Sequence, residues 1–178
     1  HDLVRHTSRY AAGHWTDARA RVAAALLLTL RGTPFLYYGE EIGMREVYIP
    51  REEIQDPAGK RYWPLYKGRD GCRTPMQWDA SPHAGFTRGI PWLRLGPDCR
   101  ERNVAAQRDD PGSLLTFYRR LLWLRKETPA LQWGGYRPLL HRPTRALAYL
   151  RETPDQTVLV LLNFSARPAT VTTDEPLP

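Results

Sequence analysis

The sequence has only two cysteines, Cys72 and Cys99, which provide neither a disulfide framework nor a set of metal ligands. It also lacks any apolar run near the ~20 residues that a membrane-spanning helix needs. The longest apolar stretch, residues 22–30, ends at Arg31. With 42% hydrophobic, 25% charged and 11% aromatic residues over 178 positions, the composition excludes a disordered or collagenous chain. Its length fits one domain, or one domain with a small appendage.

Lysine is scarce as well, with 3 Lys against 23 Arg, and the formal net charge is +7. A basic chain can bind nucleic acid or an anionic surface. Here the arginines are interleaved with acidic residues and form no block of like charge. We therefore expect no nucleic-acid partner and no membrane partner. The chain begins at His1-Asp2 without a leader, which says nothing of secretion, and we expect a cytoplasmic location.

The sequence pattern of residues 16–38 predicts a helix followed by a strand. Apolar positions recur with helical spacing over Ala18–Leu30, after a capping pattern at Thr16 and before Arg31-Gly32. The apolar residues Phe35–Tyr38 predict a short buried strand. A helix followed at once by an apolar strand is typical of an α/β layer with a parallel sheet.

The rest of the chain predicts a long packed loop, a helix and a small β domain. Residues 40–111 are rich in turn residues and tryptophan, which indicates a loop that is packed. Apolar spacing predicts a helix over Leu114–Glu127. Three strands are expected after it, at Ala146–Leu150, Thr157–Asn163 and Ala169–Thr173. We therefore expect an α/β domain over residues 1–128 and an antiparallel β domain over residues 129–178.

Two acidic groups are candidates for site chemistry. Asp2 lies between His1 and Arg5, where a carboxylate kept ionised by its neighbours would suit catalysis or substrate binding. A surface turn at a chain end is the alternative. Glu40 and Glu41 follow the expected strand, where polar residues of a parallel barrel point into the active site. Adjacent residues face opposite ways, so these two cannot form one catalytic dyad, and ordering of the long loop is the alternative.

The third candidate is the segment Gly68–Trp78, in which two arginines flank an acid and an aromatic residue follows. These residue types suit recognition of a sugar, because Arg and Asp bond hydroxyl groups and an indole stacks on a pyranose. A salt-bridged structural turn explains them equally well. The sequence contains no phosphate-binding loop, no His/Cys set with metal spacing and no Ser or Cys nucleophile beside a base. We expect no cofactor and no metal.

Together these segments resemble the α-amylase family of glycoside hydrolases, and within it the α-glucosidase and oligo-1,6-glucosidase branch. The resemblance covers residues 1 to about 165, with long motifs in the family's order. They are His1-Asp2, Arg5, Ser8-Arg9-Tyr10, Gly32-Thr33-Pro34, Tyr38–Met44, Gly68–Trp78, Ala84-Gly85-Phe86, Pro91-Trp92, Asn103-Val104, Gln107 and Leu124-Arg125-Lys126.

The resemblance implies the fold class and the site. The fold would be α/β, the C-terminal part of a (β/α)8 TIM barrel followed by an incomplete antiparallel β-sandwich. Asp2 would be the carboxylate that stabilises the oxocarbenium-like transition state, and His1 would bind the same sugar hydroxyls. Arg73 would bind substrate by fixing the non-reducing end, so that terminal glucose is removed from small α-glucosides. Glu40 and Glu41 would lie in a family loop outside the catalytic set.

The family's nucleophile and general acid lie on strands before His1, and a retaining mechanism needs both. We therefore expect the chain to be a C-terminal fragment, with the missing N-terminal part of the barrel as its partner and no activity alone. Two alternatives remain. One is a transglycosylating relative such as a trehalose synthase or sucrose isomerase. The other is a non-catalytic interaction module, against which the presence of Asp2 and Arg73 argues.

Overall fold

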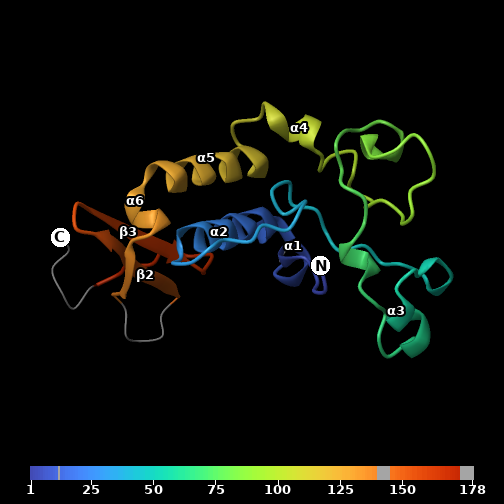
Figure 1. The fold of residues 1–178 in the computed structure, drawn as a ribbon, viewed down its shortest axis with the longest axis horizontal. Helices are drawn as coiled ribbons and strands as arrows, with labels where there is room; N and C mark the ends of the chain where they lie inside the picture. Colours follow the sequence, from blue (N-terminus) through green and yellow to red (C-terminus); the bar gives the residue numbers. More distant parts are fainter. Residues whose placement is uncertain (12, 140–144, 173–178) are drawn as a thin grey trace. The chain divides into compact units, whose positions relative to one another are not determined.

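The computed structural model describes residues 1–11, 13–139 and 145–172, and the chain divides into two compact units. The first unit contains His1–Asp17 and Leu36–Phe117, and the second contains Ala18–Phe35 and Tyr118–Pro178. Figure 1 follows the elements of both along the chain. In this division the first long helix groups with the C-terminal residues, and the domain boundary expected near residue 128 stays a prediction.

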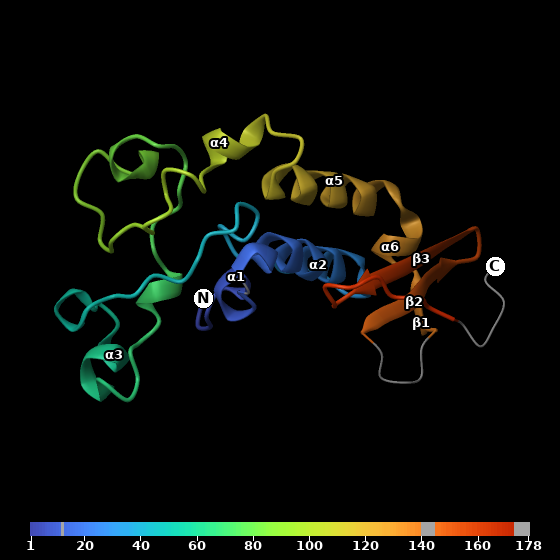
Figure 2. The same ribbon diagram turned by 180° about the vertical axis from the view of Figure 1, so that it is seen from behind.

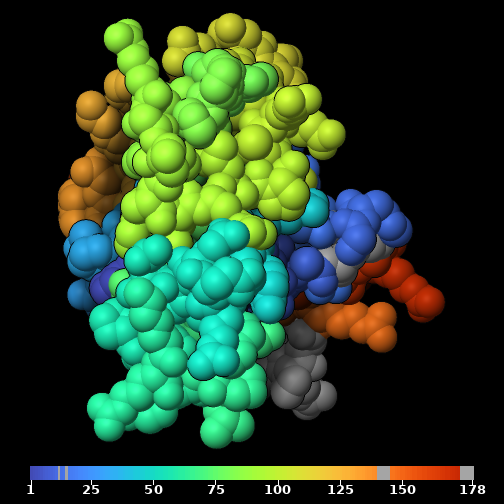
Figure 3. All heavy atoms as spheres, turned by 90° about the vertical axis from the view of Figure 1, so that its right-hand side faces the viewer, coloured from blue at the N-terminus to red at the C-terminus, as the bar shows by residue number. Residues whose placement is uncertain are grey.

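The first unit consists of loops and short helices. Its helices are α1 (His6–Arg9), η1 (Gly13–Trp15), η2 (Arg51–Glu53), α3 (Pro57–Tyr62), η3 (Asp70–Cys72), η4 (Pro82–Gly85) and α4 (Val104–Arg108). The segments around α3 and α4 fill much of the face seen in Figure 3. Two small apolar clusters hold the loops, one around Ile54 and Leu93 and one around Ile42, Met44 and Met76. The long loop is therefore packed, as the sequence indicated.

Side-chain caps explain where two of these helices begin. The Asp56 carboxylate accepts a hydrogen bond from the Ala58 amide (3.2 Å), and Pro57 occupies the first turn of α3. Asn103 caps α4 by accepting from the Ala106 amide at 2.8 Å. Both caps are buried in the loop, so each also ties its helix to neighbouring backbone.

The strand expected at Phe35–Tyr38 is absent from the structure: these residues have no regular secondary structure. A β-strand is stable only when a neighbouring strand takes up its backbone hydrogen bonds, and no described strand pairs with this segment. The Phe35 side chain is 85% exposed. Residues Phe35–Tyr38 are indeed an apolar run. They form no strand because an apolar run does not by itself provide the neighbouring strand with which it would pair.

The second unit contains two long helices and a sheet. Helix α2 (Thr16–Thr29) and helix α5 (Leu114–Glu127) each contribute most of their length, and α6 (Pro129–Gln132) follows. The three strands are β1 (Gly135–Pro138), β2 (Ala146–Thr153) and β3 (Gln156–Asn163). They pair antiparallel in the order β1-β2-β3, and α6 packs against β2 and β3 (Figure 2). The core joins Leu131, Tyr149, Val160 and Leu162 with apolar side chains of α2.

Most of the expected elements of this unit are confirmed. Both helices and the strands β2 and β3 lie where the periodicity placed them, and the Pro154-Asp155 turn joins the two strands. Strand β1 was not expected, because Gly134-Gly135 at its start indicated only a turn. Of the third expected strand, residues 169–172 form none, and Thr173 lies outside the described residues.

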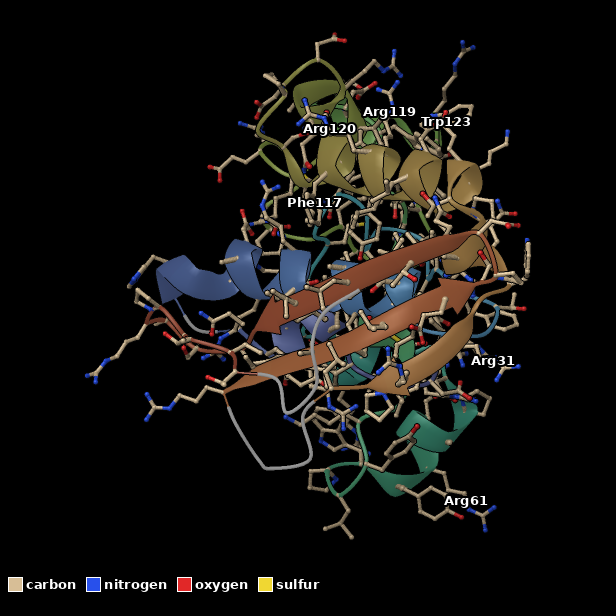
Figure 4. The ribbon with its side chains drawn as sticks, turned by 90° about the vertical axis from the view of Figure 1, so that its left-hand side faces the viewer. Arg31, Arg61, Phe117, Arg119, Arg120 and Trp123 are labelled. Carbon is tan, nitrogen blue, oxygen red and sulfur yellow. The ribbon has the colours of Figure 1, made fainter. Side chains whose placement is uncertain are left out.

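Two arginines donate hydrogen bonds to backbone carbonyls at the C-terminal end of α2 and just beyond it. The last carbonyls of a helix have no partner within it and carry partial negative charge. Arg125 donates to the carbonyls of Leu28 (2.8 Å) and Gly32 (2.7 Å), and Arg151 donates to that of Thr29 at 2.6 Å. Arg125 therefore points from α5 toward the end of α2. Its neighbours Arg119, Arg120 and Trp123 do project away from the sheet (Figure 4).

Candidate active site

The Asp2 carboxylate is the centre of the candidate site, and three basic groups converge on one of its oxygens. Oδ1 lies 2.7 Å from Arg73 Nη2, 3.3 Å from His1 Nε2 and 3.4 Å from Arg69 Nη1. Within the described residues, Oδ2 accepts no hydrogen bond. The side chain is 54% exposed. One carboxylate oxygen is thus held in place while the other is open to a ligand.

Contacts of α1 fix the segment that carries Asp2. Thr7 is buried and donates a hydrogen bond to the Met44 carbonyl at 2.7 Å. The Ser8 hydroxyl accepts from the Glu46 amide, also at 2.7 Å. Two successive side chains of this helix therefore bind the loop that follows Gly39-Glu40-Glu41.

Arg73 directly follows the η3 turn and holds both residues at the start of the chain. Its Nε donates to the His1 carbonyl at 2.8 Å, and its Nη2 donates to Asp2. The Cys72 thiol also donates to the His1 carbonyl, at 3.3 Å. The structure therefore brings the three residues expected from the sequence, His1, Asp2 and Arg73, into direct contact.

The loop before Arg73 is stabilised by a network of buried acids. Asp70 Oδ2 accepts from the amides of Gln55 (2.6 Å) and Asp56 (2.9 Å). Asp56 in turn accepts from Arg69 Nε at 2.8 Å and Nη2 at 3.0 Å. These hydrogen bonds from Arg69 hold the pKa of Asp56 well below its usual range. The salt-bridged turn is therefore present, formed by Arg69 and its acids, while Arg73 contacts Asp2 and sugar recognition by this segment stays a prediction.

A cavity of about 690 Å³ opens beside these residues. Its walls are mostly apolar and include five tyrosine, tryptophan or phenylalanine side chains, with a few polar groups among them. The lining residues are His1, Tyr37, Tyr38, Glu41, Arg73, Thr74, Pro75, Met76, Trp78, Phe86 and Trp92. Aromatic faces with a few convergent polar groups suit a pyranose, whose ring carbons stack and whose hydroxyls form hydrogen bonds.

The two glutamates have different environments. Glu40 Oε1 lies 3.2 Å from His6 Nδ1, and its Oε2 accepts from the Tyr37 amide at 3.3 Å, so Glu40 orders the loop. Glu41 lines the cavity instead. Burial raises the pKa of Glu41, opposed by two backbone hydrogen bonds. The sequence indicated correctly that the pair forms no dyad, but it did not reveal that Glu41 faces the cavity.

The described residues were also compared with what a metal site and a membrane-spanning helix require. Within residues 1–11, 13–139 and 145–172, no three His, Cys, Asp or Glu side chains gather closely enough to hold a metal ion. Over the same residues, no helix is long and apolar enough to span a membrane.

Comparison with known proteins identifies the family. The family model described as "Alpha amylase, catalytic domain" matches residues 1–134. The chain belongs to the alpha-amylase family. It is 44% identical over 171 residues to a probable alpha-glucosidase of Rhizobium meliloti, covering 96% of this chain and 31% of that protein. It is 36% identical over 186 residues to the oligo-1,6-glucosidase of Parageobacillus thermoglucosidasius, covering 94% of this chain and 33% of that one.

Solved structures of this family match the fold. The crystal structure of an alpha-glucosyl transfer enzyme matches with a TM-score of 0.87 and 45% identity, over 95% of this chain and 31% of that one. A trehalulose synthase matches with a TM-score of 0.83 and 36% identity, over 94% of this chain and 34% of that one. The expected fold class is confirmed: the chain corresponds to part of an alpha-amylase-family TIM-barrel enzyme, followed by a small antiparallel sheet. It spans about a third of the length of these relatives. The roles expected of His1, Asp2 and Arg73 stay predictions.

Proposed function

We propose that the complete polypeptide containing this chain is a retaining α-glucosidase that removes terminal α-linked glucose from maltose- and isomaltose-type oligosaccharides. The observation that carries this is the half-exposed Asp2 carboxylate, held by His1 and Arg73, which both line the aromatic cavity, in a member of the alpha-amylase family. The names of the two curated relatives, an alpha-glucosidase and an oligo-1,6-glucosidase, support hydrolysis of this substrate class.

In this proposal Asp2 stabilises the positive charge that develops on the sugar ring in the transition state. Arg73 and His1 hold Oδ1, which directs the free Oδ2 toward the substrate. Trp78 and Tyr38 offer aromatic faces to the sugar carbons. The nucleophile and the general acid of a retaining reaction would come from polypeptide preceding His1.

The test is hydrolysis of nitrophenyl α-glucoside by the complete polypeptide and by the 178 residues alone. The complete polypeptide should turn the substrate over, and Asp2→Asn should lower kcat on the order of 10³-fold because the transition state loses its anionic stabiliser. The 178 residues alone should show no turnover above a blank. Activity of the isolated chain that Asp2→Ala abolishes would contradict the division of the catalytic groups.

Transglycosylation is the second candidate, because the matching solved structures include a transfer enzyme and a trehalulose synthase. The complete polypeptide should then convert sucrose to an isomeric disaccharide faster than to glucose and fructose. Chromatography of the products separates the two functions. Free glucose as the main product from maltose and isomaltose favours hydrolysis.

A further inference from the structure

Arg5 is a buried arginine of the N-terminal motif to which the proposed chemistry assigns no role. It lies between Asp2 and α1, and only 2% of its surface is exposed. Its guanidinium has no carboxylate partner within the described residues and donates instead to two backbone carbonyls, those of Tyr38 and Cys72 (2.8 Å). The guanidinium carbon also lies 4.8 Å and 4.7 Å from the ring centroids of Tyr37 and Tyr38. Burial of a charge on backbone acceptors is costly and calls for a physical reason.

The two carbonyls belong to two chain segments that contribute residues to the cavity lining. Tyr37 and Tyr38 come from one segment, and Arg73 and Thr74, which directly follow Cys72, come from the other. The tyrosine hydroxyls make the same connection: Tyr37 donates to the Cys72 carbonyl at 3.0 Å, and Tyr38 donates to the Thr74 carbonyl at 2.7 Å. Arg5 lies at the centre of this junction, since it stacks on both rings and binds a carbonyl in each of the two segments.

The position of Arg73 depends on this junction. The Cys72 carbonyl is part of the peptide group that joins Cys72 to Arg73, so a hydrogen bond to that oxygen restricts the backbone orientation of Arg73. From this backbone, Arg73 reaches the His1 carbonyl and Oδ1 of Asp2. Only an arginine presents two rigid donors at the spacing of the two carbonyls, because the lysine ammonium is a single point.

We infer that Arg5 is a positioning residue that acts through Arg73, holding its guanidinium where it orients the Asp2 carboxylate. The inference rests on the proposed function. Displacement of a catalytic group by about 1 Å is enough to cost ~10²-fold in rate. Loss of the Arg5 junction should therefore lower kcat and leave KM nearly unchanged, since Asp2 acts mainly in the transition state.

The first experiment measures glucoside hydrolysis by the complete polypeptide with Arg5→Lys and Arg5→Met. Arg9→Met is the control, because Arg9 belongs to the same helix and is exposed. Arg5→Met should reduce kcat on the order of 100-fold and Arg5→Lys at least ~10-fold, while Arg9→Met stays within about twofold. Arg5→Lys keeps the positive charge and one donor nitrogen. Its kcat therefore still tests the inference if Arg5→Met does not fold.

A double-mutant cycle separates positioning from general destabilisation. In an Arg73→Met background, Arg5→Lys should cost less than about threefold, because the group on which it acts is already gone. If Arg5 had a purely structural role, Arg5→Lys would lower kcat by the same factor in the wild-type background and in the Arg73→Met background. Additive effects in this cycle, or wild-type kcat in Arg5→Lys, would overturn the inference.

A second experiment requires no activity and so distinguishes failure of this inference from failure of the proposed function. Cys72 is 1% exposed, and its carbonyl is bound by Arg5. Peptide-resolved alkylation by N-ethylmaleimide should label Cys72 ~10-fold faster in Arg5→Lys than in Arg9→Met, because the junction opens locally. Cys99 should label at the same rate in both. If the wild type lacks glucosidase activity, the proposed function fails, and equal labelling of Cys72 would still refute the Arg5 junction.

Discussion

Replacement of Arg151 by methionine tests how the sheet of the second unit is attached to α2. The Arg151 side chain is fully buried and donates to four backbone carbonyls from three segments of the chain. The acceptors are the carbonyls of Thr29 (2.6 Å), Leu131 (3.1 Å), Gly134 (2.9 Å) and Gly135 (3.0 Å). Methionine retains most of the apolar volume and none of the donors.

The expected loss follows from these contacts. A buried acceptor that loses its partner costs ~1–3 kcal/mol, so the loss for four acceptors is ~4–12 kcal/mol. Removal of a buried charge offsets several kcal/mol of this, because burial disfavours the guanidinium and lowers the pKa of Arg151. We expect a net loss of about 3–5 kcal/mol in the free energy of unfolding.

Urea unfolding of the chain followed by circular dichroism measures this loss. Arg151→Met should unfold at a much lower midpoint than wild type with an unchanged slope. Arg31→Met is the matched control, because Arg31 is exposed in the same unit (Figure 4) and its loss should leave the midpoint unaltered. Equal midpoints for wild type and Arg151→Met would refute the argument that these carbonyls depend on Arg151.

Three further predictions concern the site loops. Gly39→Ala should destabilise the turn after Tyr38, because Gly39 has a φ of +84° and an added Cβ would collide with Met44; faster local hydrogen exchange checks this. Burial raises the pKa of Glu41 above its ordinary 4.5, so the folded state retains that proton longer than the unfolded state and stability falls as pH rises above 4.5. Glu41→Gln should remove this fall, and Tm measured from pH 4 to 8 tests it; parallel curves for both proteins would contradict it. The lowered pKa of Asp56 has the opposite effect: its stabilisation is present above the ordinary 3.8 and is lost as pH falls below it. Asp56→Asn should therefore be less stable at pH 7, with a gap to wild type that narrows below pH 4 in the same Tm series.

The sequence by itself determined the elements that depend on local periodicity. Helices α2 and α5 and strands β2 and β3 formed as expected, because each buries a repeating apolar face. The resemblance to the family also singled out His1, Asp2 and Arg73, which the structure places in contact, and their roles stay predictions. What failed was the strand at Phe35–Tyr38, since strand formation requires a partner that local sequence does not contain.

Only the tertiary structure decided which charged side chains serve the site and which serve the fold. Arg69 and Arg73 are four residues apart in one motif, yet one is held by the buried Asp56 and the other by the half-exposed Asp2. The sequence singled out Arg5 and Glu41 but could not show that Arg5 is buried on two backbone carbonyls or that Glu41 lines the cavity, because burial and the direction of a side chain arise from residues distant in the chain. Contacts of this kind join segments tens of residues apart, and no local pattern in the sequence specifies which segments meet.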